Sequence, residues 1–145
     1  MENRKAIAAE KNRCGSHNCT QAVVCTFADI LGMDEEALKQ MGNGFGLGMG
    51  NMEGTCGALS GAALVVGLLT KDPKKSMKAM KHIMNKFQER NGATQCRLLK
   101  KDEKRPGGLR ECVMCVSDAT EFLEEELEEM QEAEGSKQEA EGRRQ

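Results

Sequence analysis

The chain has 145 residues, of which 39% are hydrophobic, 30% are charged and only 3% are aromatic, and it contains no Trp or Tyr. This length suits one domain with a real core and is too short for two domains of ordinary size. Residues 1–14 carry no apolar signal-peptide core, and the longest apolar stretch, residues 57–69, is shorter than the roughly 18 residues that span a bilayer, so we expect a cytoplasmic protein without a membrane partner.

Charge is distributed unevenly along the chain, although the net charge is only −2. From Glu121 onward ten Glu stand against three basic residues, and most of the opposing positive charge lies in residues 71–110. We assign these lysines to the outer face of an amphipathic helix, where no aromatic residue is interleaved with them to stack on bases, and we expect no nucleic-acid partner. The composition predicts a flexible N-terminus over residues 1–14, a single helical cysteine-rich domain over residues 15–131 and a disordered acidic tail over residues 132–145.

Helical spacing of apolar residues predicts the first two helices. The first covers residues 18–32; Asn18 is its N-cap and Gln21 completes a capping box. Its apolar stripe consists of Cys19, Val23, Phe27 and Ile30. A short second helix follows, with Asp34 as its N-cap and Gly42 as its end.

A glycine-rich loop occupies residues 42–54 (GNGFGLGMGNMEG), and its glycines permit positive φ angles and close approach of other groups. The loop has neither the G-x-G-x-x-G spacing of dinucleotide-binding proteins nor the Gly-Lys-Ser/Thr of a phosphate-binding loop, so we expect no nucleotide. Met49 and Met52 could serve as soft copper ligands, but methionines more often fill gaps in loops and cores.

Four further helices follow the glycine-rich loop. They are predicted over residues 56–69 with Thr55 as cap, 73–90 with Pro73 at the first position, 95–101 with Thr94 as cap, and 109–131. In the 73–90 helix the apolar stripe consists of Met77, Met80, Met84 and Phe87. No segment shows sustained strand alternation, so we predict an all-α fold, a compact bundle of about five to six helices.

Seven cysteines are the most informative feature of the composition. Their odd number and the reducing cytosol argue against a disulfide framework, which leaves metal binding, redox chemistry or simple packing. Helix N-termini favour thiolate over thiol, and four cysteines fall at predicted helix starts and would suit one shared site: Cys19, Cys56, Cys96 and Cys112.

The remaining candidates carry weaker signals. Cys25 is expected to be a small core residue, Cys14 a free residue near a mobile terminus, and Cys115 forms a C-x-x-C with Cys112 that could chelate a metal or act as a redox pair. His17 and His82 are expected to be surface or capping residues rather than ligands. No Ser-His-Asp set can be recognised, so we predict no catalytic residues of that kind and consider a hydrolase improbable.

The sequence resembles the C_GCAxxG_C_C family of redox-active proteins. The resemblance rests on residues 18–23 (NCTQAV), residues 44–68 (GFGLGMGNMEGTCGALSGAALVVGL), residues 96–99 (CRLL) and Cys112, and it covers roughly residues 18–125. One departure is that Thr55 precedes Cys56 where the family motif has Gly.

The resemblance implies that the family's four cysteines are Cys19, Cys56, Cys96 and Cys112. A related cysteine-rich domain occurs in split-Soret cytochromes, where four cysteines hold an iron–sulfur cluster. This chain has no C-x-x-C-H haem attachment site, so a haem role is not implied.

Our leading hypothesis is therefore an electron-transfer protein in which these four cysteines ligate an iron–sulfur cluster, [2Fe–2S] rather than [4Fe–4S], and which serves a redox partner protein. The alternative is a cluster-free thiol–disulfide oxidoreductase or a thiol-based redox or metal sensor. A third hypothesis is a helical adaptor whose cysteines only pack. The small-residue face of residues 57–67 also predicts a homodimer.

Overall fold

The computed structural model describes residues 3–100 and 112–143, and every regular element within them is helical. The pairing of Thr55 with Gln95 is an isolated antiparallel bridge outside any strand. The all-α prediction is confirmed. The elements are α1 (Arg4–Arg13), α2 (Cys19–Thr26), α3 (Ala28–Leu31), α4 (Glu35–Met41), the 3-10 turn η1 (Asn43–Phe45), α5 (Gly46–Met49), α6 (Gly57–Thr70), α7 (Pro73–Asn91), α8 (Cys96–Lys100) and α9 (Cys112–Arg143).

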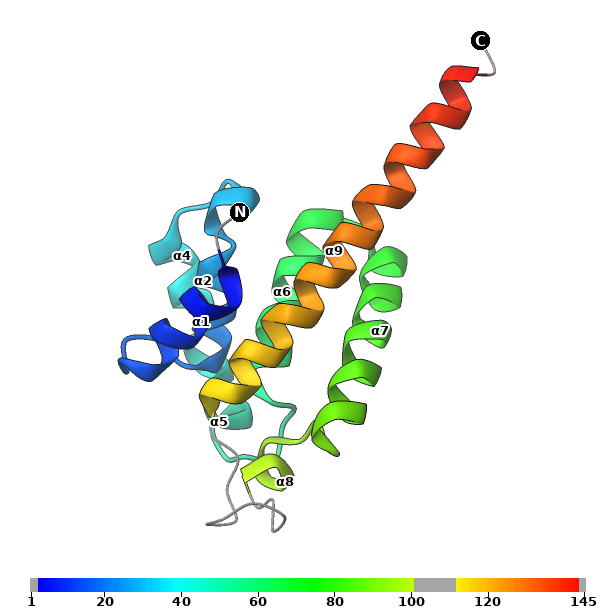
Figure 1. The fold of residues 1–145 in the computed structure, drawn as a ribbon. Helices are drawn as coiled ribbons and strands as arrows, with labels where there is room; N and C mark the ends of the chain where they lie inside the picture. The colour runs from blue at the N-terminus through cyan, green and yellow to red at the C-terminus, as the bar shows by residue number, and fades with distance from the viewer. Residues whose placement is uncertain (1–2, 101–111, 144–145) are drawn as a thin grey trace.

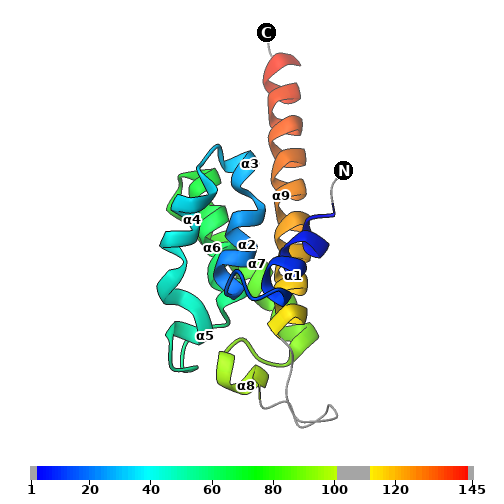
Figure 2. The ribbon, with the colours of Figure 1, turned by 90° about the vertical axis from the view of Figure 1, so that its left-hand side faces the viewer.

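The long helix α9 organises the bundle. It contacts α1 and α2 on one side and α6 and α7 on the other, while α2 also packs against α6. Figures 1 and 2 show its C-terminal part extending beyond the other helices, and α5, α8 and the start of α9 together at the opposite end. Five of the seven cysteines lie at that end: Cys19, Cys56, Cys96, Cys112 and Cys115. Among the described residues no helix is both long enough and apolar enough to cross a membrane.

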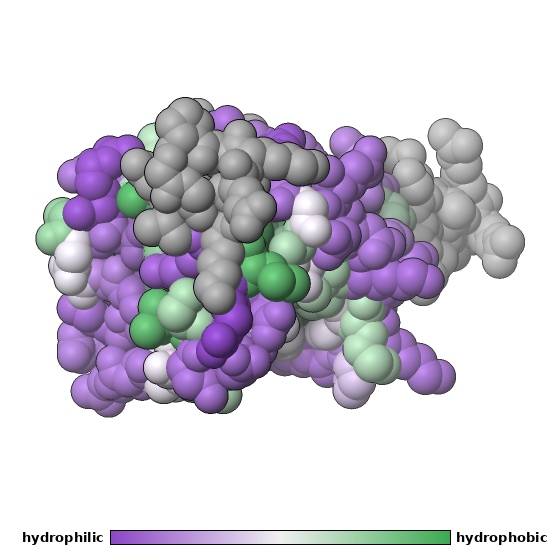
Figure 3. Space-filling model, turned by 90° about the horizontal axis from the view of Figure 1, so that it is seen from below, coloured by the Kyte–Doolittle hydropathy of each residue, from purple (hydrophilic) through white to green (hydrophobic). Residues whose placement is uncertain are grey.

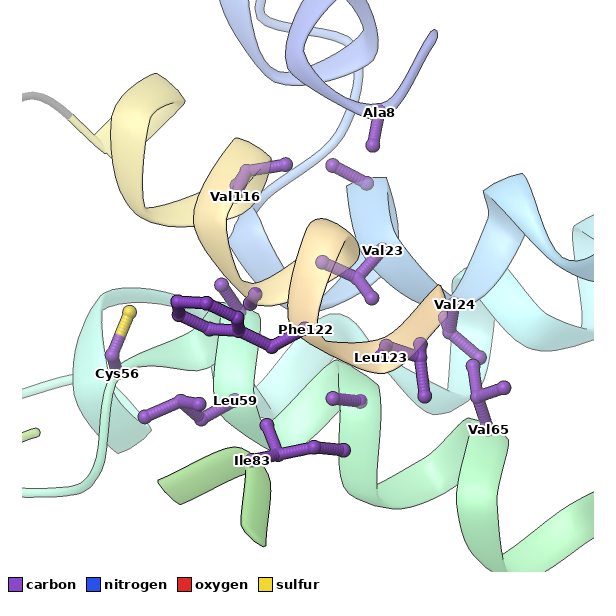
Figure 4. Packing of buried hydrophobic residues seen from close by; sticks show 14 of the residues in the cluster. Ala8, Val23, Val24, Cys56, Leu59, Val65, Ile83, Val116, Phe122 and Leu123 are labelled. Carbon is purple, nitrogen blue, oxygen red and sulfur yellow. The ribbon is translucent and has the colours of Figure 1, made fainter. Parts of the chain in front are cut away.

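The core is built from the inward faces of α2, α6, α7 and α9 (Figure 4). Phe87, Ile83 and Leu123 are fully enclosed, and a buried side chain of this kind stabilises the fold by about 1.5–3 kcal/mol. Figure 4 shows Cys56 at one edge of this cluster, close to Leu59. The core therefore ends at the cysteine-bearing end of the bundle.

Small residues let α6 approach α2 very closely. A Cβ at Gly61 would lie 2.7 Å from the carbonyl oxygen of Thr20, and at Gly57 it would lie 2.9 Å from the Thr20 hydroxyl. That hydroxyl donates to the Gly57 carbonyl at 2.7 Å. Helix α2 of the same chain thus covers the small-residue face of α6. This face therefore gives no support to the predicted homodimer, and the homodimer stays a prediction.

Several predicted helix ends are confirmed by their hydrogen bonds. Asn18 and Gln21 form the reciprocal capping box at the start of α2. The Asp34 side chain accepts from the Ala37 amide at the start of α4, and Gly92 ends α7 with φ +79°.

Other predicted details are wrong. The first helix is interrupted at Phe27, which separates α2 from α3 and leaves Ile30 45% exposed. Met77 is 66% exposed, because the buried stripe of α7 is Ala79, Ile83 and Phe87. Thr55 does not cap α6: Cys56 holds the N-cap position and makes no side-chain capping bond.

The two chain ends also differ from expectation. Residues 1–14 were predicted to be flexible, whereas the structure forms α1 there and fully buries Ala8. The disordered tail predicted for residues 132–145 is not confirmed, because α9 continues to Arg143. The predicted start of the last helix at residue 109 lies outside the described residues.

Candidate functional site

One cavity of about 240 Å³ lies where α2, α6, α8 and α9 begin. All four cysteines selected from the sequence line it, and Cys115 is a fifth. Seen from this end, apolar groups lie among hydrophilic ones on the surface (Figure 3). The lining residues are Asn12, Asn18, Cys19, Leu47, Gly48, Cys56, Gly57, Cys96, Leu99, Lys100, Cys112 and Cys115.

Three of the four cysteines stand at a helix start. Cys19 and Cys96 are the first residues of α2 and α8, and Cys56 is the N-cap of α6. This confirms the sequence-based placement of these three. Cys112 is the first described residue of α9, and the predicted start of that helix at residue 109 lies outside the described residues.

Close backbone approaches hold this arrangement together. At Gly48 φ is +57°, and a Cβ there would lie only 2.4 Å from the Cβ of Cys96. A Cβ at Gly57 would lie 3.2 Å from the Cβ of Cys19. Two glycines of the predicted small-residue segments thus allow the cysteine-bearing elements to meet.

Main-chain hydrogen bonds fix two of the cysteines. The Cys56 amide donates to the Thr94 carbonyl at 2.7 Å, and the Cys96 amide donates to the Gly54 carbonyl at 3.0 Å. These bonds tie the segment before α6 to the segment before α8. The end of the glycine-rich loop therefore helps to position Cys96.

Cys112 has an unusual electrostatic environment. The thiol of Cys19 donates a hydrogen bond to it and the Lys100 ammonium lies nearby; together these outweigh burial and lower the pKa of Cys112 to about 6. The same hydrogen bond, together with burial, raises the pKa of Cys19. Burial opposes the charge of Lys100, but the attraction of Cys112 prevails and raises the Lys100 pKa. The lowered pKa of Cys112 favours its thiolate form, and the raised pKa of Cys19 favours the thiol that donates to it.

The other two family cysteines remain thiols in the free protein. The hydrogen bond between Cys56 and Cys115, together with burial, raises the pKa of Cys56, and burial raises the pKa of Cys96. The expectation that helix starts keep all four sulfurs deprotonated is therefore wrong for Cys19, Cys56 and Cys96. Desolvation and neighbouring sulfurs outweigh the helix dipole there.

Two cavity residues were not identified from the sequence, Lys100 and Asn12. Lys100 follows Cys96 by four residues, so helical spacing places the two on one face, and it could have been found once the helices were assigned. Asn12 lies on the unexpected helix α1, where its amide reaches the Cys19 sulfur at 3.9 Å, and the sequence gave no sign of it. Cys115, which the sequence pairs with Cys112 as a C-x-x-C, also lines the cavity.

The remaining sulfur residues lie away from the cavity. Cys25 is 4% exposed within the hydrophobic core, which confirms the prediction for it, and Cys14 is exposed. Met49 is 58% exposed and does not line the cavity.

The composition of the cavity wall defines its chemistry. Among the described lining residues five are cysteines and none carries a carboxylate or imidazole. Sulfur ligands select soft metals such as zinc, copper(I) and iron in iron–sulfur clusters. Two sulfur pairs in hydrogen-bond contact, Cys19 with Cys112 and Cys56 with Cys115, also permit thiol chemistry.

Comparison with known families gives one match. The family model described as "Putative redox-active protein (C_GCAxxG_C_C)" matches residues 17–126, which include all five cavity cysteines. Searches of curated proteins and of solved structures found no match to the chain.

Proposed function

We propose that this chain, which belongs to the C_GCAxxG_C_C family of redox-active proteins, holds an iron–sulfur cluster in the cysteine cavity and exchanges single electrons with a redox partner protein. Its ligands would be Cys19, Cys56, Cys96 and Cys112. The observation that carries the proposal is the meeting of these four side chains, from four separate helical segments, on one cavity.

The residues present fit such a group. Protein-bound clusters of this kind are held by four cysteine thiolates, and the cavity offers a donor set made of sulfur. Cys19 and Cys112 are already within hydrogen-bond contact, as two ligands of one iron would be close together. We favour [2Fe–2S] over [4Fe–4S], since each iron of the smaller cluster takes two cysteines. When bound, the cluster would accept and donate one electron at a time.

The surrounding groups would tune the reduction potential. Lys100 lines the cavity, and its ammonium lies close to Cys112. Positive charge and N–H donors near cluster sulfurs favour the reduced, more negative state. Lys100 would therefore raise the potential of the site.

Cluster binding would also depend on pH. In the free protein Cys112 has a lowered pKa, whereas the pKa values of Cys19, Cys56 and Cys96 are raised. Three protons must leave when four thiolates become ligands, so acid weakens binding. The assembled site should therefore lose iron as the pH falls.

Anaerobic purification tests this proposal. Iron, acid-labile sulfide and visible absorption are measured on the protein as isolated. We expect about two iron and two sulfide per chain with charge-transfer absorption in the visible region. A colourless protein without iron would count against the cluster.

One observation favours a second function, cluster-free thiol–disulfide exchange or thiol-based sensing. The Cys112 thiolate lies against the Cys19 thiol. Cys112 would attack the disulfide of a partner protein and release one partner thiolate. Cys19, after losing its proton, would then attack the Cys112 sulfur and release the second. The chain ends with a Cys19–Cys112 disulfide and the partner gains two electrons. One of the two protons on the reduced partner comes from Cys19, and the other comes from water because Cys112 reacts as a thiolate.

Thiol titration before and after mild oxidation separates the two functions. Loss of two titratable thiols in an iron-free protein would favour exchange. The Cys56→Ser variant should still lose two thiols, because Cys56 does not belong to the reactive pair. Retention of all thiols in a protein that contains iron and sulfide would favour the cluster.

A further inference from the structure

A second cavity, of about 390 Å³, lies between α7 and α9 and shares no lining residue with the cysteine cavity. Its wall combines one imidazole with several carboxylates and two lysines. The lining residues are Lys75, Lys78, Ala79, His82, Glu126, Glu129, Met130, Ala133 and Glu134. Glu126 follows Cys112 by fourteen residues, which is about 21 Å along a helix. The two cavities are thus separate sites on one helix.

Glu126 is the unusual residue of this second cavity. It is only 4% exposed, although glutamate is almost never buried without a partner. Its Oε1 lies 2.9 Å from Nδ1 of His82, while its buried Oε2 has no hydrogen-bond partner. A buried polar atom left unpaired costs free energy, so a further partner is needed at Oε2.

The neighbouring side chains supply the rest of a metal site. Glu129 follows Glu126 by three residues and so lies on the same face of α9, while His82 reaches across from α7. One ligand atom from each of His82, Glu126 and Glu129 lies within 4.8 Å of the other two. A cation with bonds of about 2.1 Å holds its ligands at most about 4.2 Å apart, so only a small adjustment closes the set.

We propose that His82, Glu126 and Glu129 bind a divalent cation of the class that accepts imidazole and carboxylate ligands, such as Mn²⁺, Fe²⁺ or Zn²⁺. The cation would be the missing partner of the buried Oε2 of Glu126. The site bridges α7 and α9, so binding stabilises the bundle. This inference does not depend on the proposed electron transfer.

Lysine offers the competing explanation. Lys75 and Lys78 line the same cavity, and an ammonium turned onto Glu126 would satisfy the carboxyl group without a metal. The probe must also avoid the cysteine cavity. Mn²⁺ meets this need because it prefers oxygen and nitrogen ligands, whereas thiolates select softer metals.

The experiment is a titration of the full chain with Mn²⁺, followed by the electron paramagnetic resonance signal of the free ion. We expect one site, with affinity reduced at least tenfold in Glu126→Gln and in His82→Gln. Glu128→Gln is the matched control, because it removes the same charge from an exposed position of α9 outside the cavity. The Glu128→Gln variant should bind Mn²⁺ with the same affinity as the unchanged protein.

Two results would overturn the proposal. One is a protein that leaves all Mn²⁺ free at submillimolar concentration, as expected if a lysine partners Glu126. The other is equal affinity in Glu126→Gln and Glu128→Gln. A thermal unfolding midpoint that rises with Mn²⁺ in the unchanged chain and not in His82→Gln would support the site independently.

Discussion

Cys112 is the residue on which the chemistry of the cysteine cavity depends most. Its lowered pKa favours the thiolate form, because the Cys19 thiol donates to it and Lys100 lies nearby. Either function uses this charge, since a thiolate is both a metal ligand and a nucleophile. Cys19 would lose its proton when it ligates a metal or when it attacks a disulfide.

Alkylation of the metal-free protein tests this charge. The thiolate fraction of Cys112 rises as pH rises through its pKa, so its reaction with iodoacetamide should have a midpoint near about 6. Lys100→Met removes a nearby positive charge and should move the midpoint upward. Mass spectrometry of peptides must follow Cys112 separately, because a hydrogen bond with Ser16 also lowers the pKa of exposed Cys14.

Lys81→Met serves as the control, since Lys81 is exposed on α7 and does not line the cavity. Its midpoint should equal that of the unchanged chain. A Cys112 midpoint near 9 in the unchanged chain would refute the assigned charge.

Gly48 is the residue that lets the glycine-rich loop meet Cys96. Gly48→Ala would force a Cβ to 2.4 Å from the Cβ of Cys96 at a positive φ. We expect a loss of unfolding free energy of about 2–4 kcal/mol, measured in urea, because strain and overpacking add. Gly50 also has a positive φ, but the space around it is open, so Gly50→Ala should lose only about 1 kcal/mol of unfolding free energy. Equal losses in both variants would show that the contact with Cys96 contributes nothing.

At the scale of elements, the helix caps were the features that the sequence predicted best. The Asn18–Gln21 box, the Asp34 cap and the Gly92 end are local signals, since each involves residues a few positions apart. The break at Phe27 and the exposure of Met77 depend on how helices pack, which a local pattern does not contain.

Helix α1 is the element that sequence reasoning missed. Its residues are mostly polar, and its stability comes from partners elsewhere in the chain. Arg4 pairs with Asp29 through two contacts of 2.9 Å, donates to the Thr26 carbonyl at 2.7 Å and lies over the Phe27 ring. Because Asn12 of this helix reaches the cysteine cavity, α1 belongs to the site.

Replacement of Arg4 tests the attachment of α1. Arg4→Ala removes a paired charge, a carbonyl contact and packing on Phe27, so we expect a loss of about 1–2 kcal/mol in urea unfolding. Arg13→Ala lies on the same helix and removes only an exposed pair with Glu10, so it should cost about 0.5 kcal/mol or less. An Arg4 variant as stable as the Arg13 variant would mean that α1 is held by its apolar face alone.

At the scale of the whole molecule, the fold places both proposed sites along α9. The sequence allowed prediction of the all-α class and of Cys19, Cys56 and Cys96 at helix starts, because both follow from spacing along the chain. It did not allow prediction of the protonation of these cysteines. Their pKa values depend on burial and on contacts between residues as distant as Cys19 and Cys112.

The contact between Glu126 and His82 could not be predicted from the sequence either, because it also joins distant residues. His82 and Glu126 are 44 residues apart in the chain and meet only because α7 packs against α9. A lone histidine in the sequence gave no sign of this contact. Contacts of this kind depend on the packing of the helices, which the spacing of residues along the chain does not reveal.

The most direct test of the central claim is the iron and sulfide content of single Cys→Ser variants purified without oxygen. Replacement of Cys19, Cys56, Cys96 or Cys112 should remove most of both elements, because each would supply one ligand. Cys25→Ser, which changes a core sulfur outside the cavity, should retain the full content of the unchanged chain. Loss of iron in Cys25→Ser equal to that in the four others, or full retention in any of the four, would contradict the assignment.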